Sequence, residues 1–136
     1  MFGMTLREVL HAHIPTLSQE ATVRDAVDKM DIYQFPALVM VTPELAPTHV
    51  VTEGDIVRAV QQQGNLSDLA TQAVRPFASQ DPTCAHPDTE IGDALHIMLD
   101  SGLTILPVVE ENRLIGVVLR VDLMQAMIAD RLTPSV

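Results

Sequence analysis

The residues with the clearest chemical potential form a Thr-x-x-Asp sequence from Thr52 to Asp55, which follows the apolar pair Val50-Val51. This order predicts a strand that ends where a helix begins. Helix N-termini carry unpaired N–H groups that attract anions, so the position suits a bound anionic group. The same spacing also predicts a capping box, in which the two side chains bond the helix's own free amides. Thr5 to Glu8 and Thr22 to Asp25 repeat the spacing where no ligand is expected, so both interpretations stay open.

Side chains typical of catalysis or metal binding are not grouped in the sequence. His11 and His13 lie two apart on a predicted helix and point to different faces, which suits neither a metal pair nor a catalytic dyad. His96 and Asp100 are i, i+4 neighbours and predict a hydrogen bond on a helix surface. Without an activated nucleophile, a ligand set or a matched acid-base pair, the sequence predicts neither an enzyme nor a metal site.

Composition bounds the class of protein. The chain has 136 residues, 47% of them hydrophobic, and a formal charge of −10 from 8 basic and 18 acidic residues. This charge works against binding the phosphate backbone of nucleic acid, which relies on clustered Lys and Arg. Apolar runs are shorter than the ~18 residues that suggest a membrane span, and the N-terminus lacks a signal-peptide pattern. With one cysteine, Cys84, we expect a soluble cytoplasmic protein without a disulfide.

The elements that must position these residues occur twice. Asp25 recurs 68 positions later as Asp93, and Asp55 recurs 67 positions later as Asp122. Each copy predicts a short helix, an extended Pro-Thr segment, an amphipathic helix, two strands and a closing helix. The predicted helices are 6–12, 56–62, 69–74 and 123–129, with one more after Thr22 and one after Thr89; the predicted strands are 37–41, 49–51, 108–109 and 114–119.

A polar stretch divides the two copies. It predicts a first motif at 1–62, a linker at 63–68 with Ser67 as a helix N-cap, and a second motif at 69–136. Six positions separate Met30 from Pro36, whereas nine separate Met98 from Pro107. If the two prolines correspond, the first copy is degenerate and has lost about a turn after Met30.

The repeated pattern resembles the CBS domain family, small regulatory modules that occur as tandem pairs. The second copy carries the resemblance in residues 87–94, 102–109 and 114–123, and the first copy in residues 20–26, 36–39 and 50–55. The resemblance implies an α/β fold of the α+β type, in which two tandem β-α-β-β-α motifs pack as a pseudo-twofold pair. It also implies clefts between the motifs that bind adenosine-containing ligands such as AMP, ADP, ATP or S-adenosylmethionine.

The resemblance assigns roles to residues in both copies. It implies that Asp55 accepts hydrogen bonds from two ribose hydroxyls while Thr52 and the first helical amides face a phosphate. In the second copy Leu119 replaces the hydroxyl residue, Arg120 supplies charge, and residues 83–85 offer backbone groups to the adenine edge. The implied ligand-binding residues are Thr16, Leu17, Phe35, Pro36, Thr52, Asp55, Thr83, Cys84, Ala85, Thr104, Pro107, Arg120 and Asp122.

Neither copy has a complete set of these features. The first lacks the glycine-to-proline segment, residues 102–107 of the second, and His49 adds bulk where the second copy has Gly116. We therefore expect one occupied cleft, or none. The resemblance implies a homodimer that regulates an unidentified partner protein and has no catalysis or cofactor of its own. The alternative is a ligand-free dimerisation or interaction scaffold whose clefts have decayed.

Overall fold

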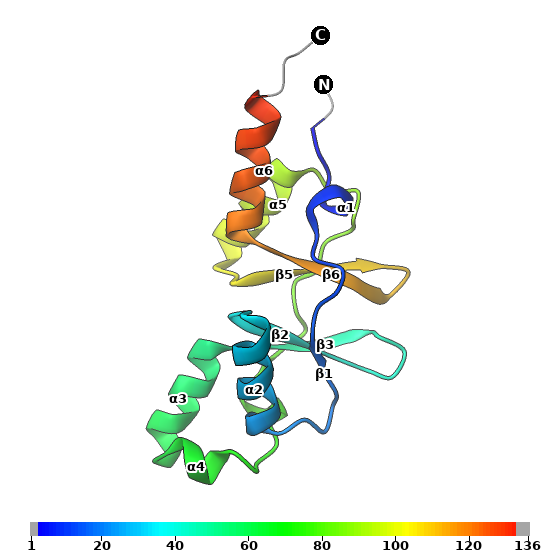
Figure 1. Ribbon diagram of the computed structural model, residues 1–136. Coiled ribbons are helices and arrows are strands. Elements are labelled where there is room, and N and C mark those ends of the chain that lie inside the picture. Colours follow the sequence, from blue (N-terminus) through cyan, green and yellow to red (C-terminus); the bar gives the residue numbers. More distant parts are fainter. Residues whose placement is uncertain (1–2, 133–136) are drawn as a thin grey trace. The chain divides into compact units, whose positions relative to one another are not determined.

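The first segment of the chain packs with the second sequence repeat. The computed structural model, which describes residues 3–132, contains two compact units. The continuous unit comprises residues 14–82, and the composite unit joins residues 3–13 to residues 83–132. The predicted α+β fold of two tandem repeats is confirmed (Figure 1). The compact units differ in extent from the predicted sequence motifs, because each repeat's preceding segment belongs to the other unit.

The continuous unit is a four-stranded sheet with helices on one face. Its strands β1 (Thr16–Leu17), β2 (Ala37–Val41), β3 (Pro47–Thr52) and β4 (Ser79–Gln80) are hydrogen-bonded in that order. Only the β1–β2 pair is parallel. The helices α2 (Val23–Tyr33) and α3 (Glu53–Gln63) lie together on the sheet, and the short helix α4 (Leu66–Leu69) and a 3₁₀ turn at Arg75–Phe77 follow (Figure 1).

The composite unit repeats this plan with its outer strands reduced to single bridges. Its hairpin consists of β5 (Ile105–Glu110) and β6 (Arg113–Leu119), and its helices are α1 (Leu6–Val9), α5 (Ile91–Ser101) and α6 (Arg120–Leu132). Ala85 pairs in parallel with Val108 in β5, and His11 pairs antiparallel with Val117 in β6. The order Ala85, β5, β6, His11 therefore matches β1, β2, β3, β4 of the continuous unit.

The segments that precede the two repeats make equivalent contacts. Residues 5–13 are hereafter called the lead segment. In this segment the Leu6 amide donates a hydrogen bond to the Thr89 carbonyl at 3.0 Å. In the continuous unit the Val74 amide donates to the Ala21 carbonyl, also at 3.0 Å. Leu6 and Val74 are both fully buried, one in each core. The two units therefore have the same internal plan, even though the composite unit is discontinuous in sequence.

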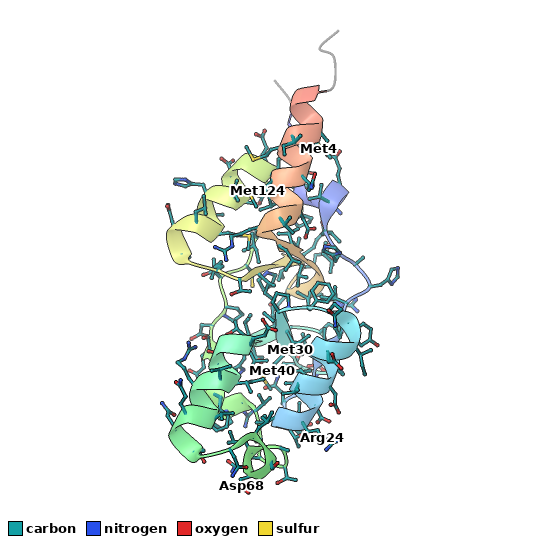
Figure 2. All side chains as sticks on the ribbon, turned by 60° about the vertical axis from the view of Figure 1, so that its left-hand side comes forward. Met4, Arg24, Met30, Met40, Asp68 and Met124 are labelled. Atoms are coloured by element: carbon teal, nitrogen blue, oxygen red, sulfur yellow. The ribbon has the colours of Figure 1, made fainter. Side chains whose placement is uncertain are left out.

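Each unit has its own apolar core, formed between the helices and one face of the sheet. The stripe predicted on α2 supplies Val23, Ala26 and Met30, and Met30 lies beside Met40 of β2 in the interior of the continuous unit (Figure 2). In the composite unit, α5 contributes Ile91, Ala94 and Met98 in the same way. Because these residues recur at i, i+3 and i+7, each helix buries one face.

Several predicted bounds were wrong for identifiable reasons. The lead helix ends at Val9 rather than residue 12, since His11 leaves the helix to pair with β6. Asn65, not Ser67, caps α4, and its side chain accepts a hydrogen bond from the Asp68 amide at 2.8 Å. Both closing helices begin three residues earlier than predicted, at Glu53 and at Arg120.

The predicted loss of a turn after Met30 was also wrong. Helices α2 and α5 both contain 11 residues, and each is followed by a residue in the left-handed conformation, Gln34 at φ 58° and Gly102 at φ 61°. Three positions later β2 begins at Ala37 and β5 at Ile105. Pro36 therefore corresponds to Thr104, and the counterpart of Pro107 is Val39.

Candidate functional site

The junction between β3 and α3 holds the predicted Thr52–Asp55 pair. Thr52 is the N-cap of α3, and its hydroxyl accepts a hydrogen bond from the Asp55 amide at 3.1 Å. In return, the Thr52 amide donates to the Asp55 carboxylate at 2.8 Å. The capping-box interpretation is thus confirmed here, as it is at Thr22–Asp25. At Thr22 the backbone hydrogen bond lowers the pKa of Asp25.

A second interaction occupies the other oxygen of Asp55. The Arg58 guanidinium, one helical turn further on, forms a short ion pair with Oδ1, while Oδ2 accepts from the Thr52 amide. The Asp55 side chain is 9% exposed, whereas that of Arg58 is 65% exposed. A ligand hydroxyl that approaches Asp55 must therefore share Oδ1 with the solvent-exposed guanidinium or displace it.

The other predicted residues of the first copy divide into two groups. Pro36 lies directly at the junction, because its carbonyl accepts from the Glu53 amide at 3.0 Å. Thr16 and Leu17 instead pair with the middle of β2, and the Leu17 side chain is fully buried in the core. The Thr16 carbonyl accepts from the Lys29 ammonium at 2.6 Å. Phe35, also assigned to the ligand site, packs against the core.

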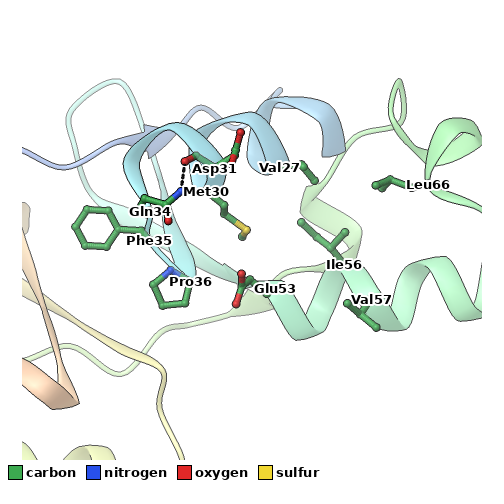
Figure 3. Close-up of a pocket in the computed structure, with 10 residues that line it drawn as sticks. All are labelled: Val27, Met30, Asp31, Gln34, Phe35, Pro36, Glu53, Ile56, Val57 and Leu66. Atoms are coloured by element: carbon green, nitrogen blue, oxygen red, sulfur yellow. Dashed lines mark hydrogen bonds between the residues drawn. The ribbon is translucent and has the colours of Figure 1, made fainter.

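A groove opens between α2 and α3 on the Glu53 side of the junction (Figure 3). It has a volume of about 530 Å³ and a mainly apolar lining, with carboxylates from Asp31 and Glu53. Its lining residues are Val27, Met30, Asp31, Gln34, Phe35, Pro36, Glu53, Ile56, Val57 and Leu66. Thr52 and Asp55 do not line it, so the groove and the predicted ribose contact are separate features.

The β6–α6 junction of the composite unit has only half of a capping box. The Leu119 amide donates to Oδ2 of Asp122 at 2.9 Å, the bond that corresponds to Thr52 and Asp55. Leu119 has no hydroxyl with which to return a bond, as the sequence indicated. The same Oδ2 lies 2.7 Å from Nε2 of His11. The charged Arg120 is exposed at the first position of α6.

The backbone of His11 is fixed beside this junction. Its amide donates to the Val117 carbonyl at 2.9 Å, and its carbonyl accepts from the Val117 amide at 3.1 Å. At neighbouring Gly116, an added Cβ would lie 2.5 Å from the His11 carbonyl oxygen. Glycine is therefore required because the lead segment crosses β6 in direct contact with its backbone.

Ala85, one of the three residues assigned to an adenine contact in the second copy, pairs with β5. The Ala85 amide donates to the Pro107 carbonyl at 2.9 Å, and the Ala85 carbonyl accepts from the Val109 amide at 2.9 Å. Both backbone polar groups of Ala85 are therefore satisfied within the sheet. Pro107 is buried within β5, opposite Val117.

The remaining second-copy residues differ in burial. Thr104 is half-buried immediately before β5, whereas Thr83 is exposed. Cys84, beside Ala85, is half-buried, and that burial raises the pKa of its thiol.

Three charged residues hold the lead segment on the composite unit. The Arg7 guanidinium lies 3.2 Å from Asp88 and 2.9 Å from Glu110 at the far end of β5. The hydrogen bond from Arg7 lowers the pKa of Glu110, and the two carboxylates raise that of Arg7. All three side chains are at least one-third exposed.

Sequence reasoning missed both residues that bond the junction carboxylates. Arg58 follows Asp55 at the i, i+3 spacing of helix neighbours, so the sequence alone could have predicted this ion pair. For His11 the sequence predicted only that it forms no metal pair or catalytic dyad with His13, and its partner Asp122 lies 111 positions away. Its contact could be found only by knowing that the lead segment pairs with β6.

Two broader predictions concern metals and membranes. Within residues 3–132, no three His, Cys, Asp or Glu side chains are placed to hold a metal ion. Among the helices of that same range, none has the length and apolarity needed to cross a bilayer.

The strand-to-helix junctions and the doubled sheet plan define a tandem repeat of one α+β domain. The sequence profile of the CBS domain matches residues 6–62 and again residues 74–129. The chain therefore belongs to the CBS domain family.

Relatives in longer proteins share this region. An uncharacterised protein of Methanopyrus kandleri is 30% identical over 126 residues, which are 92% of this chain and 63% of that protein. An inosine-5'-monophosphate dehydrogenase of Methanocaldococcus jannaschii is 30% identical over 119 residues, 87% of this chain and 22% of the enzyme. The chain thus spans less than two-thirds of either relative.

Solved structures show the same fold. The CBS-pair protein CBSX2 of Arabidopsis thaliana superposes with a TM-score of 0.84 at 18% identity, covering 98% of this chain and all of that one. A structure of CBSX2 in complex with AMP gives a TM-score of 0.79 at 19% identity, covering 95% and 99% of the two chains.

Proposed function

We propose that the chain is a regulatory module that binds an adenosine-containing ligand, AMP, ADP, ATP or S-adenosylmethionine, and signals the binding to a separate partner protein. One observation carries this proposal. Both repeats hold an aspartate, Asp55 or Asp122, at the third position of the helix that follows the second hairpin strand. The AMP complex of CBSX2 supports the choice of ligand class, because it shows that a protein of this fold takes an adenine nucleotide.

In the continuous unit the aspartate would bind the ribose. A carboxylate accepts hydrogen bonds only, so two vicinal hydroxyls donate to Asp55, while Thr52 and the first amides of α3 face the phosphate. Pro36 adjoins this position through its bond to Glu53. The exposed Glu53 carboxylate opposes a phosphate by charge, so a ligand with few negative charges is favoured in this repeat.

In the composite unit, Asp122 would take the same role beside the exposed Arg120. The positive charge at the start of α6 adds to the helix dipole and favours a phosphate there. Thr104 lies immediately before Ile105, which pairs with Leu119 at this junction. Thr83 and Cys84 are the other residues that we assign to this repeat's site.

Signalling requires a surface that meets other molecules. The helix α6 exposes Val121, Met124 and Ile128, which are 52%, 48% and 56% accessible. Exposed apolar side chains of this kind favour contact with a second copy of the chain, and we propose a homodimer in the cytoplasm. The module would act without catalysis or a cofactor of its own.

The second candidate is a ligand-free interaction scaffold. It is favoured by one specific observation: both junction carboxylates already have partners in the chain, Arg58 for Asp55 and His11 for Asp122. Under this alternative the aspartates serve only to cap helices and hold the chain together.

A thermal-shift screen separates the two candidates. The chain is melted alone and with AMP, ADP, ATP, S-adenosylmethionine or NAD(H). A bound ligand at a hundred times its dissociation constant stabilises the fold by about 2.7 kcal/mol, which raises Tm measurably. A shift with one or more adenosine compounds supports the sensor, and no shift with any of them supports the scaffold.

A further inference from the structure

We infer that His11 competes with the ligand for Asp122 and so determines whether the second repeat binds. This inference rests on the proposed function, because it concerns the same carboxylate. Oδ2 of Asp122 accepts from the Leu119 amide and also lies 2.7 Å from Nε2 of His11, so the ring takes the remaining place at this oxygen to which one of two ribose hydroxyls would donate. The imidazole is thus an internal substitute for one ribose hydroxyl.

The position of His11 is fixed by backbone as well as by side chain. Two hydrogen bonds join its main chain to that of Val117. Because residue 116 is a glycine, no side chain there keeps the lead segment away from β6. Arg7, four residues earlier, anchors the same segment through Asp88 and Glu110. The backbone that carries the ring is therefore already fixed beside Asp122. Because it is fixed, the contact between the imidazole and the carboxylate costs little further conformational entropy.

The other repeat provides an internal comparison. Ser79 of β4 pairs with Val50, as His11 pairs with Val117, so Ser79 is the counterpart of His11. The exposed Ser79 side chain is too short to imitate an imidazole, and Asp55 is bonded instead by Arg58. The two residues that bond the aspartates differ in how firmly they are held. The Arg58 side chain extends from a helix surface and is 65% exposed, whereas the His11 backbone is hydrogen-bonded to β6.

This difference predicts unequal sites. A ligand displaces Arg58 by turning a long side chain into solvent, but it displaces His11 only by rotating a ring next to a fixed backbone. The imidazole is itself 42% exposed, so such a rotation has room. We expect the first repeat to bind more readily and the second to bind once His11 moves or is removed.

The test is a titration of the full chain with AMP, followed by ¹H–¹⁵N NMR. The Leu119 amide reports the second repeat and the Thr52 amide reports the first. His11→Ser introduces the residue that the other repeat carries at this position, so the backbone pairing is compatible with the change. The matched control is His13→Ser, which alters an exposed histidine of the same segment.

The expected result is a dissociation constant at Leu119 about tenfold lower in His11→Ser than in the natural chain, with no change at Thr52. His13→Ser leaves both values unchanged, and adding Asp122→Ala to His11→Ser abolishes the gain. Binding at Leu119 that appears only in His11→Ser also supports the inference. If His11→Ser unfolds, His11→Gln replaces it, since its amide retains a donor and should give an intermediate constant.

Two results would overturn the inference, and they differ in what they say about the proposed function. If AMP shifts either reporter but His11→Ser leaves the Leu119 response unchanged, competition is rejected and ligand binding stands. If neither reporter responds in any variant, competition and the proposed AMP binding both fail.

Discussion

A Cβ atom at Gly116 would lie 2.5 Å from the carbonyl oxygen of His11 and 2.6 Å from Leu10 Cδ1. The first of these neighbours is backbone and cannot move aside like the end of a flexible side chain. The lead segment therefore lies against β6 only because residue 116 has no side chain. The first repeat has His49 at the equivalent position, where it pairs with Gln80 of β4.

Gly116→Ala should destabilise the composite unit. Forcing a methyl group against the His11 backbone resembles overpacking, which typically costs about 1–3 kcal/mol. The measurement is the free energy of unfolding from urea titration. Gly92→Ala is the control, because a methyl group at that position of α5 would meet no neighbour within 4 Å, and alanine there should stabilise by about 0.5–1 kcal/mol. Equal effects at the two glycines would contradict the close approach of the lead segment.

Asp55→Ala separates helix capping from ligand binding. Losing the capping-box carboxylate should lower the free energy of unfolding by about 0.5–2 kcal/mol. Asp25→Ala removes the same kind of carboxylate from α2, where no ligand is proposed. Both variants should lose stability, but only Asp55→Ala should weaken the binding of a ribose-containing ligand in calorimetry. Unchanged binding with a lower Tm would make Asp55 a cap alone.

The prediction of fold and site from the sequence succeeded where the signal was local. Helix periodicity identified the core residues of α2 and α5, and the Thr-x-x-Asp spacing identified the capping boxes. It failed at Gln34, which adopts the left-handed conformation that Gly102 adopts in the other repeat. Because a glutamine gives no such signal, the sequence pairs Pro36 with Pro107 and predicts a missing turn that the structure does not have.

The pairing of His11 with Asp122 was beyond any local pattern. Single bridges at Ala85 and His11 leave no strand-length run of alternating residues, so nothing in the sequence marks residue 11 as the edge of a sheet. The contact depends on which repeat the lead segment packs against. The buried side chain of Leu6 lies in the core of the composite unit, and Arg7 pairs with Asp88 and Glu110; periodicity encodes neither contact.

The Arg7–Glu110 ion pair predicts a pH-dependent contribution to stability. Arg7 lowers the pKa of Glu110 in the folded chain, so this contribution is complete above the ordinary value of 4.5 and disappears as pH falls through the lowered pKa. Arg7→Met, which keeps an apolar stem, should therefore lower Tm slightly at pH 7, and this deficit should shrink as the pH is lowered below 4.5. Arg24→Met, in a more exposed helix pair, is the control and should show a smaller difference. A Tm gap for Arg7→Met that persists at low pH would assign the effect to packing.

The thiol of Cys84 should react slowly in the folded chain. Burial raises its pKa, so less thiolate is present at neutral pH, and the thiolate is the reactive form. Alkylation by iodoacetamide at pH 7.5, followed by mass spectrometry, should be slower in the native chain than in the same chain unfolded in urea. Equal rates would show that the segment beside β5 opens readily.

Leu6→Ala should destabilise the unit that contains the second repeat, although Leu6 precedes the first repeat in sequence. Its fully buried side chain belongs to the core formed with Ala94, Met98 and Leu123, and replacing such a leucine costs about 2–5 kcal/mol. Hydrogen exchange should therefore accelerate in α5 and α6 before α2 and α3. Val74→Ala is the reciprocal control, since Val74 lies in the core with Val23 and Ile56 and should accelerate α2 and α3 first. If Leu6→Ala instead accelerated hydrogen exchange first in α2 and α3, the lead segment would pack with the repeat that follows it. The contact between His11 and Asp122 would then have no structural basis.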